Sequence, residues 1–380
     1  MSLFDGIVSC VCYGSLALMK KTFARLIRNP VLVATLLFLA GFAGVLTLSY
    51  RDRAEANARQ IVYIGGDANL YLHNLDAGTA TQLTTSEFGV EDFAIAPEGV
   101  AIAYSRYNDN STTDIWLHDL RSGEDFRLTD CINASCGQPS WRADGELIAF
   151  TRTEFEATEI QRIWTVNPTT TETRSLFDDP YITGHSPRYA PAGNRIALFA
   201  TNPLGILVYD FPTQLREVVQ SRQGSPGSFS SDGLTLSYPI MVRGALGATF
   251  FTQLETVELL SDTHTAITGA PDTPIEDVAG YWRPGHEGKM AVIRRFLDDR
   301  FTEGHQVYML NLRTGEERPL IVDADYTHGS LKWSGDGQQL LVQRFALTDP
   351  NASPEIWLYD MQADDLRRIA EDAIAGDFLP

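Results

Sequence analysis

The segment PSWRADGELIAF, residues 139–150, is the most informative part of this chain, because variants of it recur along the sequence. It leads from an aromatic residue into a tight turn that ends at Gly145, and then into the apolar run Leu147–Phe150. Glycine at the end of such a turn supplies the positive φ that a chain reversal needs. The first half recurs as FAIAPEG (93–99), PRYAPAG (187–193), GSFSSDG (227–233), LKWSGDG (331–337) and the longer GYWRPGHEG (280–288). These copies predict a repeated inner strand followed by a turn.

A second motif follows each copy in step. It alternates apolar and polar residues and closes on Asp, Asn or Glu, as expected for a strand. The seven copies start 45, 48, 43, 48, 53 and 49 residues apart: NLYLHN (69–74), DIWLHD (114–119), RIWTVN (162–167), GILVYD (205–210), QLETVE (253–258), QVYMLN (306–311) and EIWLYD (355–360). Each unit then ends with a short strand near Leu-Thr. A unit of this size cannot bury its own faces, so four short strands per unit predict the stacked blades of a β-propeller.

The two ends of the repeat predict the number of blades. The first unit starts at Ile61 and lacks an inner strand, whereas GDFLP (376–380) resembles an inner strand without the rest of its unit. Pairing the two completes a seventh blade and closes the ring without free edges. We therefore expect an all-β, seven-bladed propeller over residues 60–380, and six or eight blades if the weak unit at Gln253 is misread.

The run Trp-x-x-Asp-Gly, followed by Leu-Ile-Ala-Phe and then Ile-Trp, resembles the repeats of the TolB-like propeller superfamily. The resemblance covers roughly residues 58–380 and implies the fold more strongly than a function. Members include periplasmic interaction modules and the non-catalytic propellers of prolyl-oligopeptidase-type peptidases. The namesake of the family has six blades and a preceding α/β domain, so its partner-binding residues cannot be transferred to positions here.

A membrane anchor is predicted in front of the propeller. Val31–Tyr50 is a run of twenty uncharged residues, which as a helix spans about 30 Å, the thickness of the hydrocarbon core. The basic residues Lys20, Lys21, Arg25 and Arg28 precede it, so residues 1–30 should be cytoplasmic and the propeller extracytoplasmic, either periplasmic or at the cell surface. Residues 51–59 form a short linker. A cleaved signal peptide is the alternative, and Met19 is a second candidate for the native start.

The charge balance argues against a nucleic-acid partner. The formal net charge is −19, and residues 54–380 carry −23, because six basic residues stand against Asp5 and Asp52 in residues 1–53. Such an acidic domain repels phosphates.

No catalytic or cofactor motif is recognisable, because no Gly-x-Ser-x-Gly elbow, zinc-protease pair or phosphate-binding glycine loop is present. We therefore expect a protein that is not an enzyme and needs no cofactor or metal. Cys131 and Cys136 lie five residues apart in a loop and lack the further ligands of a zinc site. They predict a disulfide in an oxidising compartment, with free thiols as the alternative.

The loops before the inner strands should meet at the mouth of the central channel. They carry Glu91, Asp92, His185, Asp277 and His328, which together could bind a cation, a basic peptide or a small ligand. The alternative is that these side chains cap turns and bond to the backbone.

Two functions therefore remain open. The first is a membrane-anchored scaffold for a protein partner or a subunit of an envelope complex. The second is a ligand or metal sensor, or an enzyme, with its site at the channel mouth.

Overall fold

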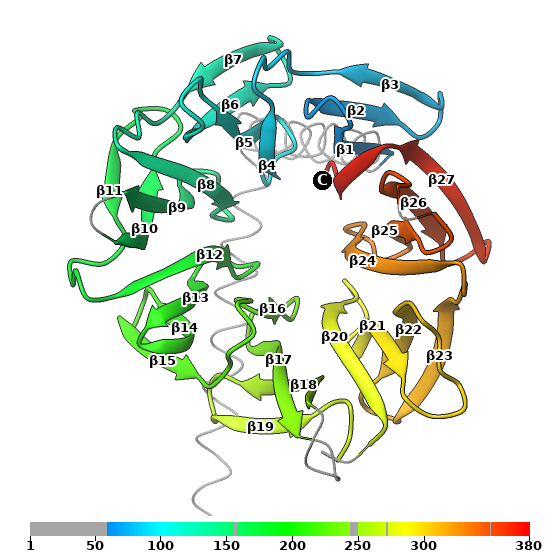
Figure 1. Ribbon diagram of the computed structural model, residues 1–380. Coiled ribbons are helices and arrows are strands. Elements are labelled where there is room, and N and C mark those ends of the chain that lie inside the picture. The colour runs from blue at the N-terminus through cyan, green and yellow to red at the C-terminus, as the bar shows by residue number, and fades with distance from the viewer. Residues whose placement is uncertain (1–58, 156–157, 244–249, 271–272, 350) are drawn as a thin grey trace, which may run out of the picture. The chain divides into compact units, whose positions relative to one another are not determined.

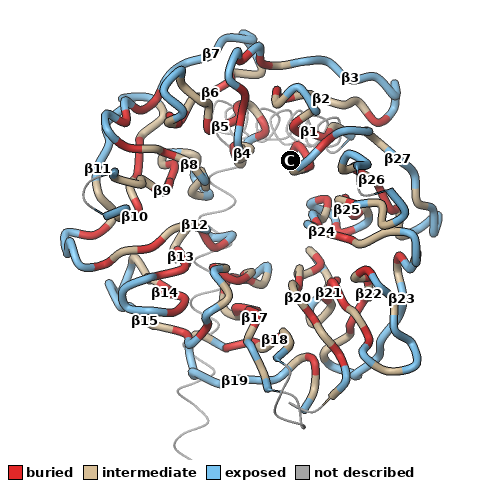
Figure 2. Tube along the Cα trace, viewed as in Figure 1, coloured by how far each residue is buried: buried red, intermediate tan, exposed pale blue. Residues whose placement is uncertain are grey.

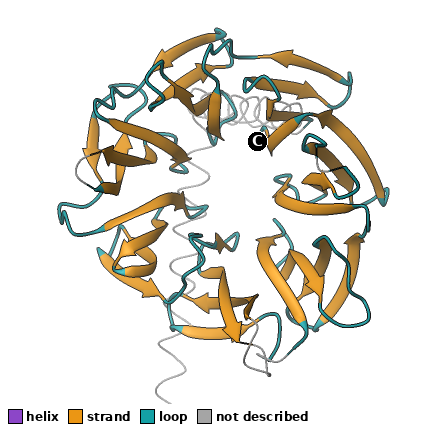
Figure 3. Cartoon of the chain, in the orientation of Figure 1, coloured by secondary structure: helices purple, strands orange, loops and turns teal. Residues whose placement is uncertain are grey.

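The chain forms seven four-stranded antiparallel sheets that radiate from a central axis, as the computed structural model shows (Figure 1). The structure describes residues 59–155, 158–243, 250–270, 273–349 and 351–380. Strands, turns and loops make up these residues (Figure 3).

Each sheet is one blade, and we number the blades from the one that contains β1. From the innermost to the outermost strand, blade 1 is β28 (Ala373–Phe378), β1 (Gln60–Gly65), β2 (Leu70–Asn74) and β3 (Thr79–Gln82). Blade 2 is β4 (Val90–Ile95), β5 (Ala101–Tyr107), β6 (Thr113–Asp119) and β7 (Glu124–Arg127). Blade 3 is β8 (Ala134–Trp141), β9 (Ile148–Phe155), β10 (Glu159–Val166) and β11 (Thr173–Ser175). Blade 4 is β12 (Thr183–Tyr189), β13 (Arg195–Asn202), β14 (Leu204–Asp210) and β15 (Leu215–Val219).

The remaining blades follow the same order. Blade 5 is β16 (Ser228–Phe229), β17 (Thr235–Arg243), β18 (Phe250–Glu258) and β19 (Thr263–Ala266). Blade 6 is β20 (Ile275–Trp282), β21 (Lys289–Phe296), β22 (Gln306–Asn311) and β23 (Glu316–Ile321). Blade 7 is β24 (Tyr326–Trp333), β25 (Gln339–Ala346), β26 (Glu355–Asp360) and β27 (Asp365–Glu371).

The two ends of the propeller meet in blade 1. Strand β28 pairs antiparallel with β1, with Phe378 opposite Ile61. Just beyond β28, Leu379 N donates a hydrogen bond to Gln60 O at 3.0 Å, an ordinary length for such a bond. The predicted closure from both chain ends is therefore confirmed, and so are the seven blades. The weak unit at Gln253 is a true blade, although its inner strand β16 has only two residues.

The hydrophobic core lies between neighbouring blades. One cluster joins Ala103 and Ile115 of blade 2 to Ile148 and Phe150 of blade 3. In Figure 2 buried residues concentrate in the middle strands of the blades, while outer strands such as β3 and β7 are exposed along their whole length. Because each blade buries its faces against its neighbours, the repeated units stabilise one another.

The Leu-Thr ending of the repeat has a structural role. The hydroxyl of Thr84 accepts from Leu70 N at 3.0 Å and donates to Asn69 Oδ1 at 3.1 Å. In blade 2 the hydroxyl of Thr129 accepts from Ile115 N at 2.9 Å and donates to Asp114 Oδ1 at 3.0 Å. This threonine thus holds the loop after the outer strand to the start of the third strand.

No helix of the described residues is long and apolar enough to cross a membrane. The predicted span Val31–Tyr50 and the segment 1–30 lie outside the described residues, as does the linker up to residue 58.

Candidate functional site in the central channel

The inner strands surround a cavity of about 870 Å³ on the axis of the propeller. All seven blades contribute to its wall. The second-last residue of every inner strand lines it, and we call these residues the channel ring: Ala94, Ser140, Arg188, Ser228, Tyr281, Lys332 and Asp377. Because side chains alternate along a strand, the last residue of each inner strand instead packs against the preceding blade.

The channel ring is cationic although the domain around it is strongly acidic. Lys332 Nζ and Asp377 Oδ2 form an ion pair at 2.7 Å across the boundary of blades 7 and 1. Arg188 is exposed and donates from Nη1 to Gly227 O at 3.0 Å. One arginine, one lysine and one aspartate give the ring a net charge of +1. Because Asp377 neutralises Lys332, this charge is that of Arg188.

Three tryptophans at the ends of inner strands tie the ring together. The indole Nε1 of Trp141 donates to Ala94 O at 3.0 Å, that of Trp282 to Ser228 O at 3.1 Å, and that of Trp333 to Tyr281 O at 3.1 Å. Each acceptor belongs to the channel ring of the preceding blade. A partly buried indole thus packs in the core and satisfies its polar group at the same time.

A second set of bonds between blades lies nearer the start of the inner strands. Gln138 N donates to Asp92 Oδ2 at 2.7 Å, and Ser186 N donates to Gln138 Oε1 at 2.9 Å. Gln138 and Ser186 have positive φ values of 57° and 56°. Their backbone amides therefore turn toward the preceding blade and connect blades 2, 3 and 4.

Two of the predicted site residues, Glu91 and Asp92, are neighbours on β4. Asp92 also accepts from the hydroxyl of Ser105. Burial raises the pKa of the Asp92 carboxyl to about 6, although the hydrogen bonds from Ser105 and Gln138 oppose this shift. Glu91 is exposed and adds to the rise through its negative charge.

His185 lies at the same end of β12. Its Nδ1 is 2.8 Å from Ser186 Oγ, and its ring centroid is 5.4 Å from that of Phe199. Burial lowers the pKa of His185. Because Ser186 also bonds to Gln138, His185 is the only histidine among the predicted site residues that joins the network of Asp92.

Asp277 is fully buried and has lost contact with solvent. It accepts from Arg294 Nε and Nη2, both at 2.7 Å, and from Thr268 Oγ1 at 2.7 Å. A bidentate pair of this kind, with a third donor, satisfies a buried carboxylate. Asp277 therefore holds β20 to β21 and to the loop after β19.

His328 is also buried, with 4% of its surface exposed. Its Nδ1 is 2.7 Å from His305 O, and Nε2 has no hydrogen-bond partner among the described residues. Burial lowers the pKa of His328 to about 4, and the charge of nearby Arg344 acts in the same direction, although the hydrogen bond to the carbonyl of His305 opposes the shift. The ring is therefore neutral at pH 7.

The structure thus brings Glu91 and Asp92 together, links His185 to them through Gln138, and separates Asp277 and His328 from that group. The described lining of the cavity includes none of the five residues. No group of three or more His, Cys, Asp or Glu side chains that could hold a metal ion occurs among the described residues. The channel ring was not predicted from the sequence. Its residues could have been found in the repeat, because each of them directly precedes the last residue of an inner strand, a position that is often aromatic.

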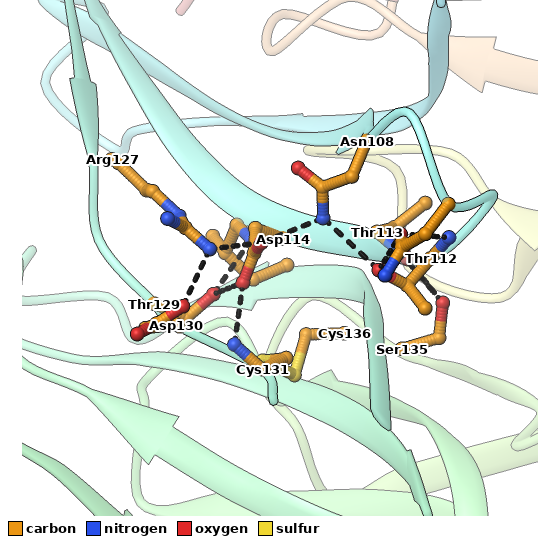
Figure 4. Close-up of polar contacts among 12 residues, drawn as sticks. Asn108, Thr112, Thr113, Asp114, Arg127, Thr129, Asp130, Cys131, Ser135 and Cys136 are labelled. Carbon is orange, nitrogen blue, oxygen red and sulfur yellow. Dashed lines mark hydrogen bonds and ion pairs between the residues drawn. A yellow bond between two sulfur atoms is a disulfide. The ribbon is translucent and has the colours of Figure 1, made fainter. Parts of the chain in front are cut away.

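A disulfide joins Cys131 and Cys136, whose Cα atoms are 6.2 Å apart (Figure 4). The loop that it closes is also held by the buried Asp114. This carboxylate accepts from Cys131 N at 2.8 Å, Asn108 Nδ2 at 2.9 Å and Arg127 Nη2 at 2.7 Å. The covalent bond and the carboxylate fix the entry into blade 3 together.

Similar solved structures are β-propeller proteins. TolB from Acinetobacter baumannii has a TM-score of 0.51 at 15% identity, over 86% of this chain and 67% of that chain. The β-propeller domain of the Trilobed protease from Pyrococcus furiosus has a TM-score of 0.54 at 14% identity, over 75% and 84% of the two chains. A puromycin-hydrolyzing peptidase from Mycobacterium tuberculosis has a TM-score of 0.56 at 13% identity, and the match covers 83% of this chain and 54% of the peptidase.

These matches confirm the predicted TolB-like propeller fold. Identities this low show the fold alone and carry no information on activity. The chain spans only about half the length of that peptidase. No protein-family model matches the sequence, and no curated protein matches it either.

Proposed function

We propose that this protein is a membrane-anchored scaffold whose propeller lies outside the cytoplasm and binds a protein partner. The polar groups near the start of the inner strands carry this proposal, because contacts within and between blades already use them. Asp92 and Gln138 accept amides of the following blades, and Asp277 is saturated by Arg294 and Thr268. Such side chains stabilise the ring, which leaves its outer surfaces for binding.

Two further features support the location. Val31–Tyr50 has the length and the flanking charges of an anchor whose C-terminal side is exported. The Cys131–Cys136 disulfide fits an oxidising compartment.

Purification of the full chain from native membranes in mild detergent, followed by mass spectrometry, tests the scaffold. We expect a partner in a constant ratio to the full chain and its loss from a control that carries residues 1–59 alone. A full chain that is always recovered alone would contradict the scaffold.

The location has a separate test. A membrane-impermeant maleimide added from outside should label Leu215→Cys, a position that is 67% exposed, in cells with a permeabilised outer layer. Labelling only after the inner membrane is opened would place the propeller in the cytoplasm.

A ligand site in the channel is the second candidate. The cavity volume of about 870 Å³ falls in the range of small-molecule sites, and Arg188 and Tyr281 offer an exposed cation and a phenol ring. Elemental analysis and thermal shifts with divalent cations and small anions, on the wild type and on Arg188→Ala, test this candidate. It fails if the protein contains no metal and no compound shifts the melting temperature.

A further inference from the structure

The strand order gives the propeller two chemically different faces. Inner strands start at one face, so the connections from one blade to the next and those between second and third strands lie there. We call it the loop face. The tight turns after the inner strands and after the third strands lie at the opposite face, the turn face.

Exposed apolar residues are concentrated on the loop face. Among the described residues fifteen large apolar side chains are exposed, and twelve of them belong to loop-face connections or to the adjoining strand ends. The three exceptions are Phe126 on outer strand β7, Leu215 at the turn-face start of outer strand β15, and Leu260 in the turn between β18 and β19. Single exposed apolar residues are ordinary on any protein, but such a one-sided distribution indicates an interaction surface.

Four of the exposed apolar residues lie on the loop-face connections of blades 3 and 4. Ile132, Phe155, Tyr181 and Leu204 are 68%, 46%, 77% and 48% exposed. We call these four residues the loop-face patch.

Backbone contacts bring the members of the loop-face patch close in pairs. Phe155 N donates to the carbonyl of Asn133, the neighbour of Ile132, at 3.3 Å. Asn202, two residues before Leu204, donates from Nδ2 to Tyr181 O at 2.7 Å. The disulfide at Cys131 holds the loop of Ile132, so part of the patch is fixed before any partner binds.

Three carboxylates lie beside members of the loop-face patch: Glu159 is opposite Phe155 in the pairing of β9 and β10, and Asp178 and Asp179 closely precede Tyr181. Glu159, Asp178 and Asp179 are exposed, and no described cation forms a salt bridge with them. Asp179 instead accepts from Tyr181 N at 3.0 Å. A complementary surface therefore presents apolar side chains among lysines and arginines.

The charge of the rim argues for a protein and against the lipid surface as the occupant. The exposed carboxylates of Glu159, Asp178 and Asp179 repel anionic lipid headgroups, whereas they attract the basic side chains of a protein partner.

We propose that the loop-face patch, with the rim of Glu159, Asp178 and Asp179, is the docking site for a basic, partly apolar surface of an extracytoplasmic protein. The inference rests on the proposed scaffold function and names the surface that performs it.

The test compares two double variants of the full chain in the same co-purification. Tyr181→Ser with Leu204→Ser removes two residues of the patch, and Leu215→Ser with Leu260→Ser removes two exposed residues of the turn face. We expect roughly tenfold less partner with the first variant and an unchanged amount with the second. Asp178→Lys with Asp179→Lys should reduce the yield as well, and raising the salt concentration should weaken the wild-type complex.

Each other outcome overturns a different claim. If the partner is retained by all three variants, the scaffold function stands and the docking site lies elsewhere. If the wild-type chain brings down no partner, the scaffold function itself fails. If light scattering shows a dimer that Tyr181→Ser with Leu204→Ser abolishes, the patch binds a second copy of the chain. If the wild type floats with lipid vesicles and the same variant does not, the patch binds the membrane. Either result overturns the proposal.

Discussion

The connections on the turn face are near copies of one another, whereas those on the loop face differ widely. The turns after the inner strands end on glycines with similar φ, such as Gly99 at 60°, Gly145 at 73° and Gly337 at 67°. On the loop face one residue separates β13 from β14, and nine residues separate β21 from β22.

This difference separates two roles in one ring. A turn that recurs in the same form serves the repeat, because it must return the chain into the next strand at a fixed spacing. A connection that is free to change can carry recognition without disturbing the sheets. Four sets of substitutions test this division: three change buried contacts near the loop face, and the fourth changes turns of the opposite face.

The largest effect is expected at Asp277, near the loop-face end of blade 6. Asp277→Ala leaves Arg294 buried without its bidentate partner, which should lower the free energy of unfolding by about 3–5 kcal/mol. Glu287→Ala, which removes an exposed ion pair with Arg313 on the turn face, should cost no more than about 1 kcal/mol. Urea unfolding of both variants checks the comparison, and equal losses would contradict it.

The second effect is a dependence on pH that His328 introduces. Its pKa falls from 6.5 in the unfolded chain to about 4 in the fold, so the neutral ring stabilises the protein above pH 6.5. That contribution, about 3 kcal/mol, should disappear as the pH drops from about 6.5 to about 4. The groups around the ring are Arg344, Asp323 and His305.

Asp92 acts in the opposite sense, since its raised pKa gives stability that is complete below 3.8 and is lost as the pH rises through about 6. His328→Asn removes the titrating ring and retains a donor for His305 O. Urea unfolding at pH 4 to 7 should show less loss of stability on acidification in this variant than in the wild type. Identical pH profiles would show that His328 does not titrate in this range.

The third effect concerns the disulfide of the loop into blade 3. Cys131→Ser with Cys136→Ser should lower the free energy of unfolding by about 2 kcal/mol, because the closed loop is short. Urea unfolding of the variant and of the wild type, each with and without reductant, measures this. The reductant should destabilise only the wild type, and an equal response of both proteins would argue against an oxidised pair.

The smallest effect distinguishes two glycines of the turn face. A Cβ on Gly145 meets no atom within 4 Å, so Gly145→Ala should cost about 1 kcal/mol through its positive φ alone. A Cβ on Gly337 lies 2.5 Å from Pro284 O of the neighbouring blade, so Gly337→Ala should cost about 2 kcal/mol. Thermal unfolding resolves the difference, and equal melting temperatures would mean that the turns do not touch across blades as described.

The repeat allowed the sheets, their number and their closure to be predicted, because each depends on periodicity. The placement of Asp277 and His328 could not be predicted in the same way. Both lie five residues before the last residue of their inner strand, and regular alternation would point them at the channel beside Tyr281 and Lys332. The pairing register shifts between Asp277 and Ala279 and between His328 and Leu331. A bulge adds one residue, which reverses the side on which the preceding side chains lie.

The pairing of β28 with β1 also determines when the domain can be completed during synthesis. The first blade lacks its inner strand until residues 373–378 have left the ribosome, some three hundred residues after β1. Until then β1 exposes an unpaired edge, and the ring remains an open arc whose first and last sheets can pair with other chains. A chaperone that covers this edge would therefore have to act on the nascent protein before the ring closes.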